Sequence, residues 1–151
     1  MIHELAHAFF CLSSGIRVRD IKLFRFGNPA GYVTHDEPTK FFQGFLISFG
    51  PLIINSLLAL FCFSQFKAPY LDYRPWAFVW FGTAVALHAI PSTGDAGSLF
   101  TLANHRFWRN PLVIIGYPFI LVLYILNFLK RWHLDIIYAG VLFWLGNIYL
   151  K

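Results

Sequence analysis

The chain has 151 residues, of which 58% are hydrophobic and only 13% are charged. Soluble domains carry about 25% charged residues, so this composition excludes an ordinary soluble globular protein and predicts one that lies in a lipid bilayer. The formal net charge of +5 does not predict nucleic-acid binding, because the basic residues are scattered at the ends of apolar runs. Loops that flank membrane helices carry their basic residues in this way.

The first predicted element is a helix from residue 1 to about residue 14, with Gly15 as its stop. Such a helix is about 21 Å long, against a hydrocarbon core of about 30 Å. Its amino terminus would then lie inside the bilayer, where a charge is costly. We therefore expect that the complete working protein has further apolar residues before Met1.

A short β-hairpin is predicted for residues 16–34. Apolar and charged residues alternate over residues 16–23, with a slip in phase near Arg19-Asp20 and another near Leu23-Phe24. The run Gly-Asn-Pro-Ala-Gly at residues 27–31 is a strong turn signal, and a second short strand follows it.

Four long apolar stretches are predicted to cross the membrane as helices. They are residues 41–66, 76–91, 111–129 and 134–150. The expected fold is therefore an all-α polytopic membrane protein with about four transmembrane helices, a partial N-terminal helix and the hairpin. It forms one membrane-embedded domain over residues 1–151, in which residues 104–151 add two helices to the part formed by residues 1–103.

The basic residues predict an orientation for the chain. If the helices alternate in direction, residues 16–40, 104–110 and the C-terminus share one side, with eight Lys and Arg residues. The other side, with residues 67–75 and 130–133, has four. The positive-inside tendency then places the hairpin side in the cytoplasm.

The run His3-Glu4-Leu5-Ala6-His7 carries the chemistry. Two histidines four residues apart project from one face of a helix, where both nitrogens can reach one zinc ion. Glu4 lies beside that face, where its carboxylate can take a proton from a zinc-bound water. These groups would be costly in hydrocarbon without partners, and a metal ion removes that cost.

A catalytic zinc usually has three protein ligands and an open position for water. Asp95 is the best candidate for the third ligand, because it follows Pro91 and stands between Gly94 and Gly97, where a helix is broken. The alternative is that Asp95 only caps a helix over residues 96–103.

Other polar candidates lie in or near apolar segments: His88, Asn55, His35, Asp36 and Glu37. His88 could donate a hydrogen bond to a substrate, support a ligand from the outside, or simply pack in the core. The group around His35 reads more easily as a solvated loop.

The order of these parts resembles the site-2 protease family of intramembrane zinc metalloproteases. The resemblance rests on the histidine motif at residues 3–7, the hairpin, the run Gly50-Pro51-Leu52 with Asn55, and Pro91 followed by Asp95. It covers residues 1 to about 100. The chain departs from the family pattern where Gly94-Asp95-Ala96 stands in place of Leu-Asp-Gly, and where His88 replaces an asparagine.

The resemblance implies one Zn²⁺ held by His3, His7 and Asp95, with Glu4 as the base that activates water. It implies a membrane-embedded protein substrate that is unwound and cut near the cytoplasmic face, with Asn55 and His88 helping to position it. The hairpin would pair with the unwound substrate. The main rival is a catalytically inactive homologue that acts as a binding or regulatory partner. A transporter that uses His and Asp to bind ions is weaker, because no inverted repeat is visible.

Overall fold

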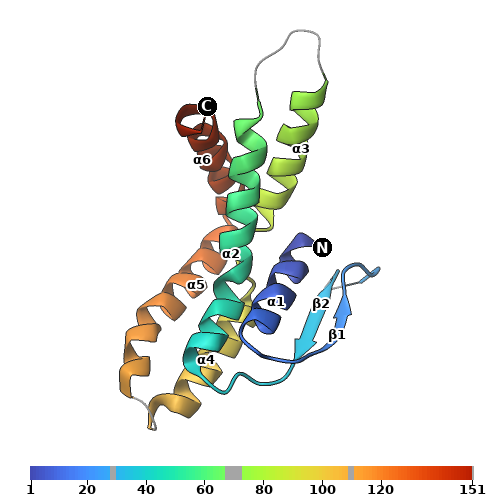
Figure 1. Cartoon of the computed structure of the whole chain (residues 1–151). Helices are drawn as coiled ribbons and strands as arrows, with labels where there is room; N and C mark the ends of the chain where they lie inside the picture. Colours follow the sequence, from blue (N-terminus) through green and yellow to red (C-terminus); the bar gives the residue numbers. More distant parts are fainter. Residues whose placement is uncertain (28–29, 67–72, 109–110, 151) are drawn as a thin grey trace.

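The computed structural model describes residues 1–27, 30–66, 73–108 and 111–150 (Figure 1). Its elements, in chain order, are α1 (Ile2–Ser13), β1 (Val18–Lys22), β2 (Tyr32–His35), α2 (Phe41–Ser64), α3 (Arg74–Leu87), α4 (Thr93–Phe107), the 3₁₀ helix η1 (Pro111–Gly116), α5 (Tyr117–Lys130) and α6 (Leu134–Tyr149). The protein is mostly helical with one antiparallel hairpin, as the sequence predicts.

The long helix α2 is the centre of the structure, and α1, α3, α4 and α6 all pack against it (Figure 1). The packing of α1 on α2 is close, because a Cβ atom on Gly50 would lie 2.2 Å from the ring of Phe10. Only glycine permits this approach, and it fixes how the N-terminal helix lies against α2.

The predicted end of the first helix and the predicted hairpin are both present. Gly15 has a φ of +72°, and the N–H groups of Gly15 and Ile16 donate to carbonyls of the last turn of α1. This left-handed ending turns the chain into β1. The pairing of β1 with β2 is irregular between Val18 and Asp20, where the sequence predicts a slip in phase. The turn residues 28–29 lie outside the described residues.

Helices α3 and α4 together run back along α2, with a break between them. Leu87 ends α3, and Thr93 begins α4, with Pro91 in the connection. The prediction of a single helix from 76 to 91 followed by a short helix from 96 is therefore imprecise at both boundaries. The break lies next to the middle of α2, because Asn55 contacts His88 and Ser48 contacts Asp95.

Helices α5 and α6 run in the same direction as α2, one after the other. At the start of α2, a Cβ atom on Gly116 would meet the ring of Phe41 at 2.1 Å. Further along, Ser56 contacts Tyr138 at 2.6 Å, and Figure 1 shows α6 ending beside the end of α2. The predicted alternation of direction, which places the end of the chain on the side of the hairpin, is therefore wrong. That prediction assumed that the chain reverses direction after each apolar run, whereas α5 and α6 run the same way, one after the other (Figure 1).

Two of the described helical stretches are long and apolar enough to cross a membrane: Phe41–Ser64 and Val113–Lys130. Leu134–Tyr149 is apolar but shorter. Large apolar side chains are also exposed along these helices, with Leu57 at 62%, Phe128 at 67% and Ile137 at 62%. Soluble monomers rarely expose contiguous apolar surface of this kind, so the described helices support association with a membrane.

Candidate metal centre

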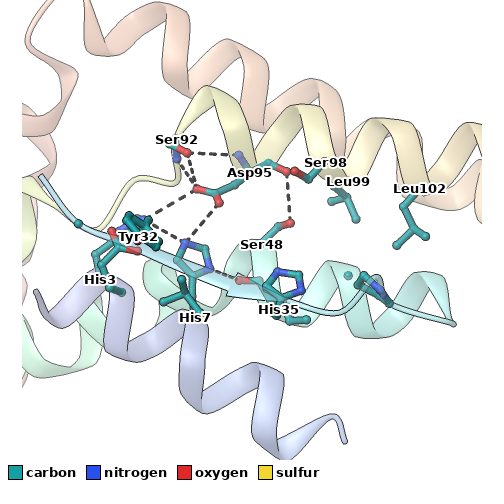
Figure 2. Close-up of a pocket in the computed structure, with 16 residues that line it drawn as sticks. His3, His7, Tyr32, His35, Ser48, Ser92, Asp95, Ser98, Leu99 and Leu102 are labelled. Carbon is teal, nitrogen blue, oxygen red and sulfur yellow. Dashed lines mark hydrogen bonds and ion pairs between the residues drawn. The ribbon is translucent and has the colours of Figure 1, made fainter. Parts of the chain in front are cut away.

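The first helix presents both of its histidines toward the break between α3 and α4. His3 and His7 are one turn apart on α1, and Figure 2 shows both imidazoles pointing toward Asp95 at the start of α4. His7 is buried, with 7% of its surface exposed, and His3 is half-buried. The predicted helical spacing is thus realised, and the imidazole rings are 4.8 Å apart.

His3, His7 and Asp95 converge on one point. The two Nε2 atoms are 3.2 Å apart, and Oδ1 of Asp95 is 3.3 Å from Nε2 of His7. Oδ2 of Asp95 is 3.8 Å from Nε2 of His3. One ligand atom from each residue lies within 4.8 Å of the others. A tetrahedron with metal–ligand bonds of about 2.0–2.1 Å has edges of about 3.3–3.4 Å, so these atoms are close enough together to hold one metal ion.

The hydrogen bonds on the far side of each ring fix which nitrogen faces this point. Nδ1 of His7 donates to the carbonyl of Ile47 at 2.9 Å, and Nδ1 of His3 donates to the carbonyl of His88 at 2.7 Å. Because a carbonyl can only accept, a neutral ring then carries its proton on Nδ1 and a lone pair on Nε2. Two lone pairs and a carboxylate that face one another repel unless a metal ion, or a proton on one of the histidines, lies between them. Ligand histidines in metal sites are commonly held in this way.

Asp95 both caps α4 and faces the histidines. The backbone N–H and the hydroxyl of Ser92 donate to Oδ2 of Asp95 at 2.7 and 2.8 Å, and the N–H of Asp95 donates to the Ser92 hydroxyl. The two sequence interpretations of Asp95, ligand or cap, are therefore compatible in one geometry. Ser92 holds one carboxylate oxygen, which leaves Oδ1 directed toward His7. Ser92 was not predicted as a site residue, although the pattern Ser-x-x-Asp is a helix-start signal.

Glu4 lines the same pocket as the three clustered residues and is not one of them. This pocket has a volume of ≈ 340 Å³, and the hairpin forms one of its walls. A Cβ atom on Gly31 would lie 3.0 Å from Cγ of Glu4 and 2.9 Å from the carbonyl of Lys22. The hairpin therefore packs directly on the side chain of Glu4, which the sequence predicts as the base.

Asn55 and His88 lie behind the cluster and do not line this pocket. Nδ2 of Asn55 donates to the carbonyl of His88 at 2.9 Å, which is the carbonyl that also receives His3. The His88 ring contacts the carbonyl of Ala84 in its own helix at 2.9 Å. In the described structure, His88 thus contacts His3 through its main-chain carbonyl. Asn55 is linked to His3 by donating to the same carbonyl.

His35 lies at the end of β2 and lines both the pocket at the cluster and a second, larger pocket of ≈ 940 Å³. Its Nδ1 donates to the carbonyl of Asp36 at 2.8 Å. Asp36 pairs with Arg19 of β1, and Glu37 lines the larger pocket. None of these three residues belongs to the cluster of His3, His7 and Asp95.

Comparisons of the chain with models of protein families, with curated proteins and with solved structures found no match.

Proposed function

We propose that this chain is an intramembrane zinc metalloendopeptidase of the site-2 protease type, which hydrolyses peptide bonds in membrane-embedded protein substrates. The observation that carries the proposal is the meeting of His3, His7 and Asp95 in one pocket, with Glu4 in the same wall. The histidines are contributed by α1 and the aspartate by α4, in a chain of strongly apolar helices. A polar cluster at this place calls for a chemical explanation, because unpaired charges are costly among apolar helices.

Each residue has a separate role in the proposed reaction. His3 and His7 would bind Zn²⁺ through Nε2, and Asp95 would bind it through Oδ1. The bound zinc would supply a Lewis acid and lower the pKa of a coordinated water toward about 7. Glu4 accepts the proton of the attacking water and passes it to the leaving amine.

The hairpin and the two pockets suggest how a substrate lies in the site. Tyr32, Val33 and His35 of β2 line the smaller pocket, so one edge of the two-stranded sheet faces the cluster. An unwound substrate segment can pair with such an edge through its main chain. The larger pocket continues along α4 past Gly97 and Thr101, and would take the residues that follow the cleaved bond.

In this proposal α2 crosses the bilayer, and α3 and α4 together run back beside it. Val113–Lys130 is also long and apolar enough to cross. Six of the nine described basic residues lie between α1 and α2 and at the end of α4: Arg17, Arg19, Lys22, Arg25, Lys40 and Arg106. The other three are Arg74, at the start of α3, and Lys130 and Arg131, at the end of α5. By the positive-inside tendency, this end of the molecule faces the cytoplasm.

The test is cleavage of a membrane-embedded model substrate by the purified chain in proteoliposomes. The zinc-loaded protein should cleave the substrate, a chelator should stop cleavage, and one equivalent of zinc should restore it. Zinc that binds without any cleavage across a panel of transmembrane substrates would favour the inactive, partner-binding homologue. A chain that binds no zinc would contradict both the site and the activity.

A further inference from the structure

Helix α2 contacts each proposed ligand on the side that faces away from the metal, directly for His7 and Asp95 and through the carbonyl of His88 for His3. These contacts come from little more than two turns of α2. The carbonyl of Ile47 receives Nδ1 of His7, and the hydroxyl of Ser48 donates to the main-chain carbonyl of Asp95 at 3.3 Å. Asn55 donates to the carbonyl of His88, which receives His3. The three ligands come from α1 and α4, so α2 is the element that they have in common.

Pro51 explains why the carbonyl of Ile47 is available for His7. In a regular helix, the carbonyl of residue 47 would accept the N–H of residue 51. Pro51 lies inside α2 and has no N–H, so this carbonyl has no helical donor. A buried carbonyl without a donor must find another partner, and Nδ1 of His7 is that partner at 2.9 Å.

The end of α3 supplies the matching carbonyl for His3. Leu87 is the last residue of α3, and the next carbonyl, that of His88, belongs to a helix end whose acceptors have no helical donors. It receives both His3 and Asn55, at 2.7 and 2.9 Å. Asn55 thereby ties this carbonyl to α2, one turn beyond Pro51.

We infer that Pro51 and Asn55 are positioning residues of the zinc site, which hold His7 and His3 in the orientation that binds the metal. Neither residue is explained by the stability of α2. A proline in a helix interior destabilises the helix. Asn55 is completely buried, and within the described structure its Oδ1 has no hydrogen-bond partner, which also costs stability. Their roles at the site explain both residues. Pro51 leaves the carbonyl of Ile47 free to accept from His7, and Asn55 holds the carbonyl of His88 that accepts from His3.

If Pro51 and Asn55 are positioning residues, their substitution should lower zinc affinity without lowering the stability of the zinc-free protein. Pro51→Ala tests this most clearly. Alanine restores an N–H that competes with His7 for the carbonyl of Ile47 and favours a regular helix. Zinc affinity should fall about ten- to a hundredfold, as it does when outer partners of metal ligands are lost. The melting temperature of the zinc-free protein should stay the same or rise. Asn55→Ala should lower zinc affinity in the same range.

Matched controls come from elsewhere in the chain. Pro118 stands in the first turn of α5, where a proline removes no helical hydrogen bond. Nδ2 of Asn147 donates to a carbonyl of its own helix at 2.9 Å, far from the cluster. In Pro118→Ala and Asn147→Ala, zinc affinity should stay within about twofold of that of the parent chain.

The measurement is zinc competition against a chromophoric chelator on the detergent-solubilised full chain, with melting curves with and without zinc. The absorption of the Co²⁺-substituted protein should also change in the two site variants and not in the controls. Parent-like zinc affinity and an unchanged cobalt spectrum in Pro51→Ala and Asn55→Ala would overturn the inference. Equal losses in zinc-free stability and in affinity would also overturn it, because they indicate a structural role.

This inference rests on the proposed zinc site and does not depend on peptidase activity. If the parent chain binds no zinc, the proposed site fails. If the parent binds zinc and both variants bind it equally well, only the positioning role fails.

Discussion

Nε2 of His7 lies 3.3 Å from Oδ1 of Asp95, across the contact between the first helix of the chain and the fourth. The contacts that hold each side chain come from neither the helix of the other residue nor the other residue itself. His7 is fixed by the carbonyl of Ile47 in α2, and Asp95 is fixed by Ser92 at the start of α4. The candidate centre is thus assembled by the packing of three helices, and each helix can be tested separately.

The ligand set predicts how zinc content responds to substitution. The parent chain should hold one zinc ion, and both His7→Ala and Asp95→Ala should weaken zinc binding by more than the roughly ten- to hundredfold typical of outer-shell changes. Metal analysis of the purified variants, after dialysis against a chelating buffer, checks this. Asp135→Ala is the control, since Asp135 stands in the first turn of α6, away from the cluster. Undiminished zinc in Asp95→Ala would remove Asp95 from the site.

Ser92→Ala should affect both helix stability and the metal site. The loss of this N-cap costs about 1 kcal/mol of the free energy of unfolding, and it also releases Oδ2 of Asp95. We therefore expect a lower melting temperature and weaker zinc binding together. Ser64→Ala, at the exposed end of α2, removes a comparable hydroxyl contact and should leave zinc affinity as it is. Normal zinc affinity in Ser92→Ala would show that the cap does not orient the carboxylate.

The pattern of residues predicted which side chains lie close together better than it predicted the arrangement of the chain. The spacing of His3 and His7 is local, so helix geometry alone places both on one face. Asp95 could be found because Pro91 and two glycines mark a broken helix. The direction of α6 could not be predicted in this way. The length of an apolar run indicates how long the helix is, but not whether it runs parallel or antiparallel to the helices beside it.

The outer partners of the site were the least predictable part. The carbonyls of Ile47 and His88 belong to the main chain. Every residue has such a carbonyl, so the residue type does not indicate which ones accept a hydrogen bond from a histidine. The only sequence signal was indirect. Because Pro51 has no N–H, its presence in a helix indicates that the carbonyl of Ile47, one turn earlier, has no helical donor. Asn55 was expected to position a substrate, and in the structure it donates to the carbonyl of His88, which also accepts from the proposed ligand His3.

Gly31→Ala should reduce activity without removing zinc. The new Cβ would lie 2.9 Å from the carbonyl of Lys22 and 3.0 Å from Cγ of Glu4, so the hairpin or the base must shift. A displacement of about 1 Å near reacting groups can cost about a hundredfold in rate. Gly140→Ala is the control, because nothing lies within 4 Å of its added Cβ. Cleavage rates and zinc content, measured on the same preparations, decide the outcome, and a parent-like rate in Gly31→Ala would separate the hairpin from catalysis.

The most direct test of the whole account is the Glu4→Gln variant, assayed for zinc content and for cleavage of a membrane-embedded substrate in the same proteoliposomes. Glutamine keeps the size of the side chain and cannot accept the proton of the attacking water. General acid–base groups contribute about 10²–10⁴-fold to rate, so cleavage should fall by at least about a hundredfold. The variant should still hold one zinc ion per chain, because Glu4 is not one of the three clustered ligands. Cleavage within a fewfold of the parent rate, with zinc bound, would contradict the proposed role of Glu4 and the mechanism built on it.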